Sequence, residues 1–309
     1  MITNMEKRKQ DITVLRDLHP KVKQEVFDNK SNFYDRDGTN LSDKYELIMK
    51  TTKEQSRALK GKDELERHEM ENGKFIFAFF EGVKLLEERF ETLSSRDIAR
   101  LMLIGTYVAW ETNRLQSDNG KKALKKKDIA ELVKISSRRF NELYNRYVKE
   151  GVMVEGESGQ LFLDSTVIYR GSMKKLGSKV DGLNHTRVFR KTVRELYDKF
   201  NGRKIGQLAL VYSIIPFLNF DSNLVCYNPS ETDANLAEPI NIKQLAELLG
   251  YTNEAKLTAA LNGISVNEIP MFTYVINPHN RRDKRVIVNP RIIFAGNGES
   301  LNQFKKLFN

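Results

Sequence analysis

The chain has 309 residues, 40% of them hydrophobic, so it can form two domains with buried cores. Its 51 lysines and arginines outnumber its 41 acidic residues, and the formal charge of +10 favours a polyanionic partner, because each neutralised phosphate releases counterions. A single cysteine, Cys226, excludes an internal disulfide framework. The absence of an apolar leader and of any run of about 18 apolar residues predicts a cytoplasmic protein that does not enter a membrane.

The first part of the chain, residues 1–72, is polar and rich in charge. We expect a helical arm there, loosely packed and partly disordered, without a functional site. The aromatic run Phe75–Phe80 predicts a strand or the buried start of a helix. Apolar residues at helical spacing then predict two helices, and Ser94 or Ser95 can cap the second.

After a polar loop, the sequence predicts helices over residues 126–134 and 137–150. Gly151 can end the second of these because glycine tolerates positive φ. Residues 152–163 contain two short runs of strand-forming residues separated by a glycine-containing turn, which predicts a β-hairpin. Helix, short helix, helix and hairpin is the order of a winged helix, a helix-turn-helix variant in which a hairpin flanks the recognition helix.

Similar residues recur later in the chain at three offsets, and the gaps between the offsets fall in loops. An offset of 110 positions matches Phe79 with Phe189, Ile98 with Leu208 and Asn113 with Asn223. An offset of 116 positions matches residues 129–132 with residues 245–248. An offset of 125 positions matches residues 161–163 with residues 286–288, and Ile168 with Ile293. Chance similarity between amphipathic segments is the alternative. The repeat predicts a mainly α fold with small β-hairpin wings (α+β), divided into a winged-helix domain over 73–180 and a second one over 181–309.

The third helix of the first unit is the candidate DNA-reading element, because that helix of a winged helix enters the major groove. Residues 121–149 hold ten basic and three acidic residues, a net charge of +7. Arginine can bind guanine, and asparagine adenine, through two hydrogen bonds each. The candidate DNA-binding residues here are Lys121, Lys122, Lys125, Lys126, Lys127, Ser136, Ser137, Arg138, Arg139, Asn141, Asn145, Arg146 and Lys149. A solvated helix face is the alternative interpretation.

The second unit differs in charge. Its third helix, near residues 253–262, contains Lys256 but no arginine, whereas its hairpin is strongly basic. The candidate DNA-binding residues of this hairpin are Arg281, Arg282, Lys284 and Arg285. We expect them to grip the DNA backbone without reading bases; dimerisation or a protein partner is the competing interpretation of this unit.

Catalytic and metal-binding patterns are not evident. No Gly-x-x-x-x-Gly-Lys-Ser/Thr motif for phosphate binding occurs, and one cysteine cannot form a thiolate zinc site. The four histidines lack metal-ligand spacing, and we expect them on the surface. The sequence therefore predicts no enzyme activity, no catalytic or metal-ligating residues, no cofactor and no small-molecule substrate, and it places Cys226 as a buried structural thiol.

The first unit resembles the winged-helix replication proteins of Firmicute plasmids, the RepL family, and related phage proteins. The segments of the first unit that carry the resemblance are Phe75–Phe80, Asp128–Leu132, Ser136-Ser137 and Ile168–Gly171. The second unit ends in Val288–Gly296, which is similar to the Asn-Pro and Gly ending of such proteins. The tandem arrangement is also similar to the two-winged-helix plasmid initiators of the Rep_3 type. The resemblance implies a replication initiator that recognises origin DNA.

The sequence therefore predicts a protein that binds double-stranded DNA sequence-specifically and acts in replication initiation or transcriptional regulation of a phage or plasmid. An initiator and a repressor share these features, and a homodimer is left open. The alternative class is an interaction module or scaffold in which winged helices bind a protein partner.

Overall fold

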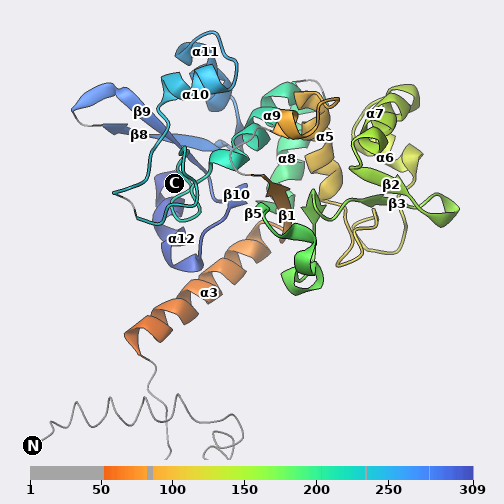
Figure 1. The fold of residues 1–309 in the computed structure, drawn as a ribbon, viewed down its shortest axis with the longest axis horizontal. Helices are drawn as coiled ribbons and strands as arrows, with labels where there is room; N and C mark the ends of the chain where they lie inside the picture. The colour runs from red at the N-terminus through yellow and green to blue at the C-terminus, as the bar shows by residue number, and fades with distance from the viewer. Residues whose placement is uncertain (1–51, 82–85, 203, 234, 278, 309) are drawn as a thin grey trace, which may run out of the picture. The chain divides into compact units, whose positions relative to one another are not determined.

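The computed structural model describes residues 52–81, 86–202, 204–233, 235–277 and 279–308, without the side chains of residues 86, 87, 281 and 282. It contains helices and small antiparallel sheets, which is consistent with the expected α+β class (Figure 1). The elements up to residue 169 are α3 (Lys53–Glu71), β1 (Phe75–Phe80), α4 (Leu86–Arg89), α5 (Ser95–Gly105), α6 (Lys126–Leu132), α7 (Ser137–Lys149), β2 (Met153–Glu155), β3 (Leu161–Leu163) and β4 (Ile168–Tyr169).

The later elements repeat much of that order. They are β5 (Asn184–Phe189), α8 (Arg190–Phe200), α9 (Ile205–Ser213), α10 (Ile242–Leu248), α11 (Glu254–Asn262), β6 (Ser265–Val266), β7 (Ile269–Pro270), β8 (Phe272–Asn277), β9 (Asn280–Val288), β10 (Ile293–Phe294) and α12 (Gly298–Lys305). Residues 57–309 form one compact unit. The expected domain boundary at residue 180 stays a prediction. We call residues 75–171 the first segment and residues 184–296 the second segment.

A four-stranded antiparallel sheet of order β10-β5-β1-β4 joins the two segments. The aromatic run Phe75–Phe80 is its strand β1, which confirms one of the two structures expected there. Strand β1 pairs along its whole length with β5, so each segment completes the sheet of the other. No local sequence pattern predicts this pairing, because the two strands lie more than 100 positions apart along the chain.

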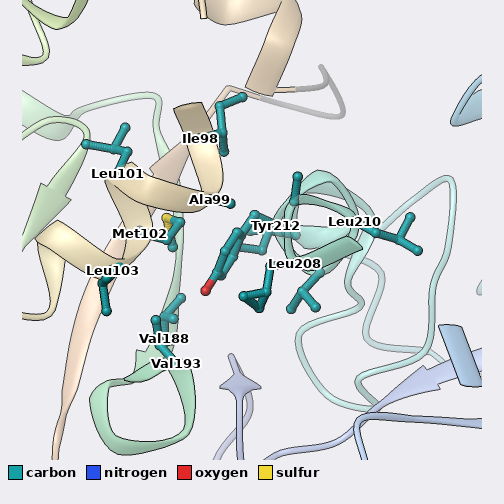
Figure 2. Close-up of a cluster of buried hydrophobic side chains, with 14 of the residues drawn as sticks. Ile98, Ala99, Leu101, Met102, Leu103, Val188, Val193, Leu208, Leu210 and Tyr212 are labelled. Atoms are coloured by element: carbon teal, nitrogen blue, oxygen red, sulfur yellow. The ribbon is translucent and has the colours of Figure 1, made fainter. Parts of the chain in front are cut away.

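The main core lies where helices α5 and α9 cross, and these two helices occupy equivalent places in the two segments. Figure 2 shows Leu101 and Met102 of α5 on one side of this core and Leu208 and Tyr212 of α9 on the other. All four side chains are buried. The α6–α7–β2–β3 group and the α10–α11–β8–β9 group lie on opposite sides of this centre (Figure 1).

Hydrogen bonds recur at the positions that the sequence comparison matches. Asn113 Nδ2 donates to the carbonyls of Leu163 and Ile168, at 3.2 and 2.5 Å. Asn223 Nδ2 donates to the matched carbonyls, those of Val288 and Ile293, at 3.1 and 2.7 Å. The two asparagines also share a left-handed backbone, with φ of 54° and 52°. The same local architecture is therefore built twice.

Helix α3 packs on the end of the second segment. His68 is buried, and its Nε2 lies 2.8 Å from the Pro290 carbonyl while its ring meets Phe189 edge-on. Lys305 of α12 binds Glu64 at 3.0 Å. The expectation that all histidines lie on the surface is wrong for His68, because α3 is packed more closely than its polar composition suggested.

Two of the other three histidines lie within the described residues. His185 and His279 are exposed, as expected. His19 and the rest of residues 1–51 lie outside the described residues. The expected partial disorder of the arm therefore stays a prediction.

Candidate nucleic-acid interface

Helix α7 follows α5 and α6 and precedes the hairpin β2–β3, and its boundaries follow from local sequence. Ser136 caps it by accepting a hydrogen bond from the backbone of Arg139, at 3.4 Å. Gly151, with φ of 69°, ends it as expected. The predicted range of 137–150 is therefore confirmed to within one residue.

One face of α7 is anchored in the core. Phe140, Leu143 and Tyr147 are buried at helical spacing, and the Tyr147 hydroxyl donates to the Asp97 carbonyl at 2.6 Å. Because three large side chains fix the rotation of the helix, the opposite face is held toward solvent. The exposed candidate residues on α7 and its cap are Ser136, Ser137, Arg138, Arg139, Asn141, Asn145 and Lys149.

Two arginines stand in the first turn of α7. The Arg138 side chain is 92% exposed, and its ion pair with Glu142 is long, at 3.7 Å. The Arg139 side chain forms no ion pair within the described part of the chain. Cations near a helix N-terminus oppose the helix dipole, an unfavourable arrangement of about 0.3–1 kcal/mol each. The helix dipole therefore does not favour two arginines at this position.

Arg146 has a different role from the one expected. Its guanidinium binds the buried carboxylate of Asp97, with Nη2 3.0 Å and Nε 3.2 Å from Oδ2. Asp97 also binds Arg100 at 3.2 Å and caps α5 through the backbone of Ser94. Arg146 thus ties α7 to α5, and its contact with DNA stays a prediction.

The lysine run before and within α6 is partly neutralised. Lys122 binds Asp128 at 2.6 Å, and this hydrogen bond lowers the pKa of the Asp128 carboxyl. Lys126 binds Glu155 at 2.7 Å and lies 3.9 Å from the centre of the Tyr144 ring. The other three lysines, Lys121, Lys125 and Lys127, are exposed and form no ion pair with the described residues. These three supply the free positive charge of the run.

The first hairpin carries acidic rather than basic residues. Glu155 lies on β2 and accepts a hydrogen bond from the Tyr144 hydroxyl at 3.0 Å, so it fixes the hairpin against α7. Its bond to Lys126 lowers the pKa of Glu155 and raises that of Lys126. Glu157 lies at the tip. This hairpin therefore orients α7 and offers no cations to a phosphate.

The described side chains of α11 and β9 supply fewer unpaired cations than those of α7. Helix α11 begins after Asn253, which accepts a hydrogen bond from the Lys256 backbone at 2.9 Å, and carries Glu254 in its first turn. On β9, Lys284 is half-buried and Arg285 binds Asp283 at 3.0 Å. The side chains of Arg281 and Arg282 lie outside the described residues, so their predicted contacts are not placed by the structure.

Several charged contacts were not anticipated from the sequence. Lys134, counted in the basic segment, binds Asp198 of α8 at 3.0 Å and so joins the two segments. Arg190 and Arg194 of α8 converge with Arg170 on Asp118 of the first segment. No sequence signal could have found them, because each pairs residues more than 50 positions apart.

Other chemical sites are sparse in what the structure describes. No cluster of three or more metal-ligating side chains occurs there, and none of the described helices could cross a bilayer. Cys226 is buried as expected, and burial raises the pKa of its thiol to about 11. Comparison with family models, curated proteins and solved structures finds no match to this chain.

Proposed function

We propose that this chain binds double-stranded DNA through two winged-helix units, without catalysing a reaction, in replication initiation or transcriptional regulation of a phage or plasmid. The observation that carries the proposal is the exposed first turn of α7, where Arg138 and Arg139 oppose the helix dipole. Helix α6, the capped turn at Ser136 and the hairpin β2–β3 surround α7 in the winged-helix order.

The polar and charged residues of the first unit form two groups, one suited to base contacts and one suited to phosphate contacts. Arg138, Arg139, Asn141 and Asn145 supply the donor and acceptor groups suited to base edges. Lys121, Lys125 and Lys127 lie before and at the start of α6, where cations serve as phosphate contacts. The acidic hairpin tip at Glu157 repels phosphates, so the first wing stays away from the DNA backbone.

The test is a salt series of duplex affinity with variants of matched charge. Duplexes selected from a random pool would provide the ligand, and fluorescence anisotropy the affinity. We expect log affinity to fall linearly with log salt, by about 0.9 per phosphate contact. The double variant Arg138→Ala/Arg139→Ala should lose about 1–3 kcal/mol per base contact.

Two controls separate the causes of that loss. Lys174→Ala/Lys175→Ala removes the same charge from exposed residues far along the chain from α7 and should change affinity little. Arg138→Lys/Arg139→Lys keeps the charge but loses the two-bond base contacts of both arginines, so it should discriminate less between DNA sequences than the wild type does. An α7 alanine variant that is folded and binds as the wild type does would refute the proposal.

A protein-interaction role for the second unit is the other candidate. Val275 and Ile276 of β8 are 45% and 49% exposed, and α11 has no arginine. Sedimentation of the wild type and of Val275→Thr/Ile276→Thr would test it, since these substitutions keep strand propensity while removing apolar surface. A dimer that the substitutions dissociate would favour this role; a wild-type monomer would count against self-association.

A further inference from the structure

Three arginines from both segments converge beside the loop before α6. Arg170 follows β4, while Arg190 and Arg194 lie one turn apart at the start of α8. The Arg190 and Arg194 side chains are only 13% and 21% exposed, and Arg170 is half-buried. Such a grouping is unfavourable unless something offsets its charge, because like charges repel more strongly away from water.

Neutral groups hold these guanidinium groups in place. Arg190 Nε donates to the Thr106 carbonyl at 2.7 Å, and Arg194 Nη2 donates to the same oxygen at 2.9 Å. Arg194 also lies 3.8 Å from the centre of the Tyr107 ring, and Arg170 donates to the Val108 carbonyl at 3.3 Å. These contacts fix geometry but neutralise no charge.

Asp118 is the carboxylate that balances them. Its Oδ1 lies 2.5 Å from Arg194 Nη1 and 3.7 Å from Arg190 Nη2. Within the described chain, it is the one acid that favours the charged forms of both Arg170 and Arg190. Burial and the two neighbouring arginines lower the pKa of Arg190 to about 10. Three positive charges thus face one negative charge.

Asp118 is well suited to give way to another anion. Its side chain is 62% exposed, and it lies in a polar turn that ends at Gly120, where φ is 70°. Asn119 supports this turn by accepting hydrogen bonds from Ser117 and from the backbone of Lys121. Lys121 begins the lysine run described above, so this turn leads directly along the chain into that run.

We propose that Arg170, Arg190 and Arg194 form a binding site for a phosphate-type oxyanion, which Asp118 occupies with its own carboxylate in the free protein. Guanidinium groups match the oxygens of phosphate with paired N–H donors, and a phosphate brings more negative charge than the carboxylate that it displaces. If the phosphate belongs to a DNA backbone, the site rests on the proposed function; a free phosphate needs no such premise.

The first arm of the experiment contains no DNA, so its outcome is independent of the proposed function. Calorimetric titration with inorganic phosphate would compare the wild type with Asp118→Asn. When Asp118 occupies the site, the apparent affinity for phosphate is reduced to the fraction of molecules in which the site is open. If that fraction is about a tenth in the wild type, Asp118→Asn should bind phosphate about 10-fold more tightly. Asp118→Asn/Arg170→Gln should lose the gain, since Arg170 makes one weak backbone contact and is the least structural of the three.

The second arm measures duplex affinity, with Asp181→Asn as the control for an equal charge change at another exposed aspartate. Tighter duplex binding by Asp118→Asn than by Asp181→Asn would support the site and assign the phosphate to DNA. Equal duplex binding by the two, with the gain for inorganic phosphate retained, would support the site and assign it to free phosphate. No gain in either arm for a folded Asp118→Asn protein would overturn the proposal.

Discussion

Phe77 and Arg187 lie opposite each other in the β1–β5 pair, and the same two residues are matched by the 110-position repeat. The antiparallel pairing is therefore symmetric about this one residue pair. The outer strands obey the same symmetry, because Tyr169 pairs with Phe77 and Phe294 with Arg187. A repeat that was visible along the chain thus becomes a local two-fold arrangement in space.

The first prediction concerns the matched asparagines. Asn113→Ala and Asn223→Ala should each lower the free energy of unfolding by about 2–4 kcal/mol, because buried carbonyls lose their donor and alanine disfavours positive φ. Asn113→Gly should cost less than Asn113→Ala, since glycine relieves the backbone term alone. Urea denaturation measures all three. Equal losses for the glycine and alanine variants would show that φ contributes nothing there.

The second prediction concerns the link between α5 and α7. Asp97→Ala should destabilise the fold by about 3–5 kcal/mol, because it removes a buried carboxylate that caps α5 and leaves Arg100 and Arg146 without their ion-pair partner. Arg146→Ala should cost less, because Asp97 keeps its bond to Arg100. A double-mutant cycle should give a coupling of about 0.5–3 kcal/mol between Asp97 and Arg146. Additive losses would contradict the linkage.

The third prediction is a pH dependence of stability. Burial lowers the pKa of His68 from 6.5 to about 4, and its neutral ring accepts from Asn72 and donates to the Pro290 carbonyl. Below pH 6.5 the unfolded chain binds a proton that the folded chain does not. The contribution of neutral His68 to the free energy of unfolding is therefore present above pH 6.5 and is lost as the pH falls toward 4. We expect the free energy of unfolding to fall by about 2 kcal/mol from this cause between pH 7 and pH 5.

The measurement for His68 is urea unfolding at pH 7, 6 and 5, with His68→Gln beside the wild type. The glutamine variant should be less stable at pH 7 but show a shallower decline with acid. An identical decline in the two proteins would exclude His68 as the cause. Lys305, Glu71 and Arg291 also influence this ring electrostatically, so ionic strength should be held constant.

The fourth prediction concerns the contact between α3 and α12. A Cβ on Gly298 would lie 1.7 Å from the Gly61 carbonyl oxygen, closer than atoms can approach. Gly298→Ala should therefore separate the two helices and increase amide hydrogen exchange in α3. Ser300→Ala on the same helix serves as the control, because its hydroxyl makes only long contacts, of 3.4 and 3.5 Å. Unchanged exchange in Gly298→Ala would contradict the close crossing.

Local features of the fold could be predicted from sequence, whereas its long-range contacts could not. Ser136, Gly151 and the alternation over residues 152–163 specify α7 and its hairpin because caps, positive φ and strand alternation are short-range effects. The β1–β5 pairing has no such local cause. The two segments meet through apolar surfaces that sequence alone shows only as apolar.

The candidate interface divides in the same way. Exposure of Arg138 and Arg139 followed from the helical period, since Phe140, Leu143 and Tyr147 occupy the buried face. The ion pair between Arg146 and Asp97 could not be predicted from the helical period, because the two residues are 49 positions apart and their contact depends on how α5 crosses α7. Charge counts along the chain thus overstate the charge available to a ligand.

The shared sheet has a consequence for any shortened form of the protein. A fragment ending near residue 180 would keep β4 on one side of β1 and expose on the other the backbone groups that β5 satisfies. Because the β1–β5 register is symmetric about Phe77, a second fragment could supply its own β1 in the place of β5. Cutting the chain in two would thus replace an intramolecular strand pair with an intermolecular one, and the fragment would associate in proportion to its concentration.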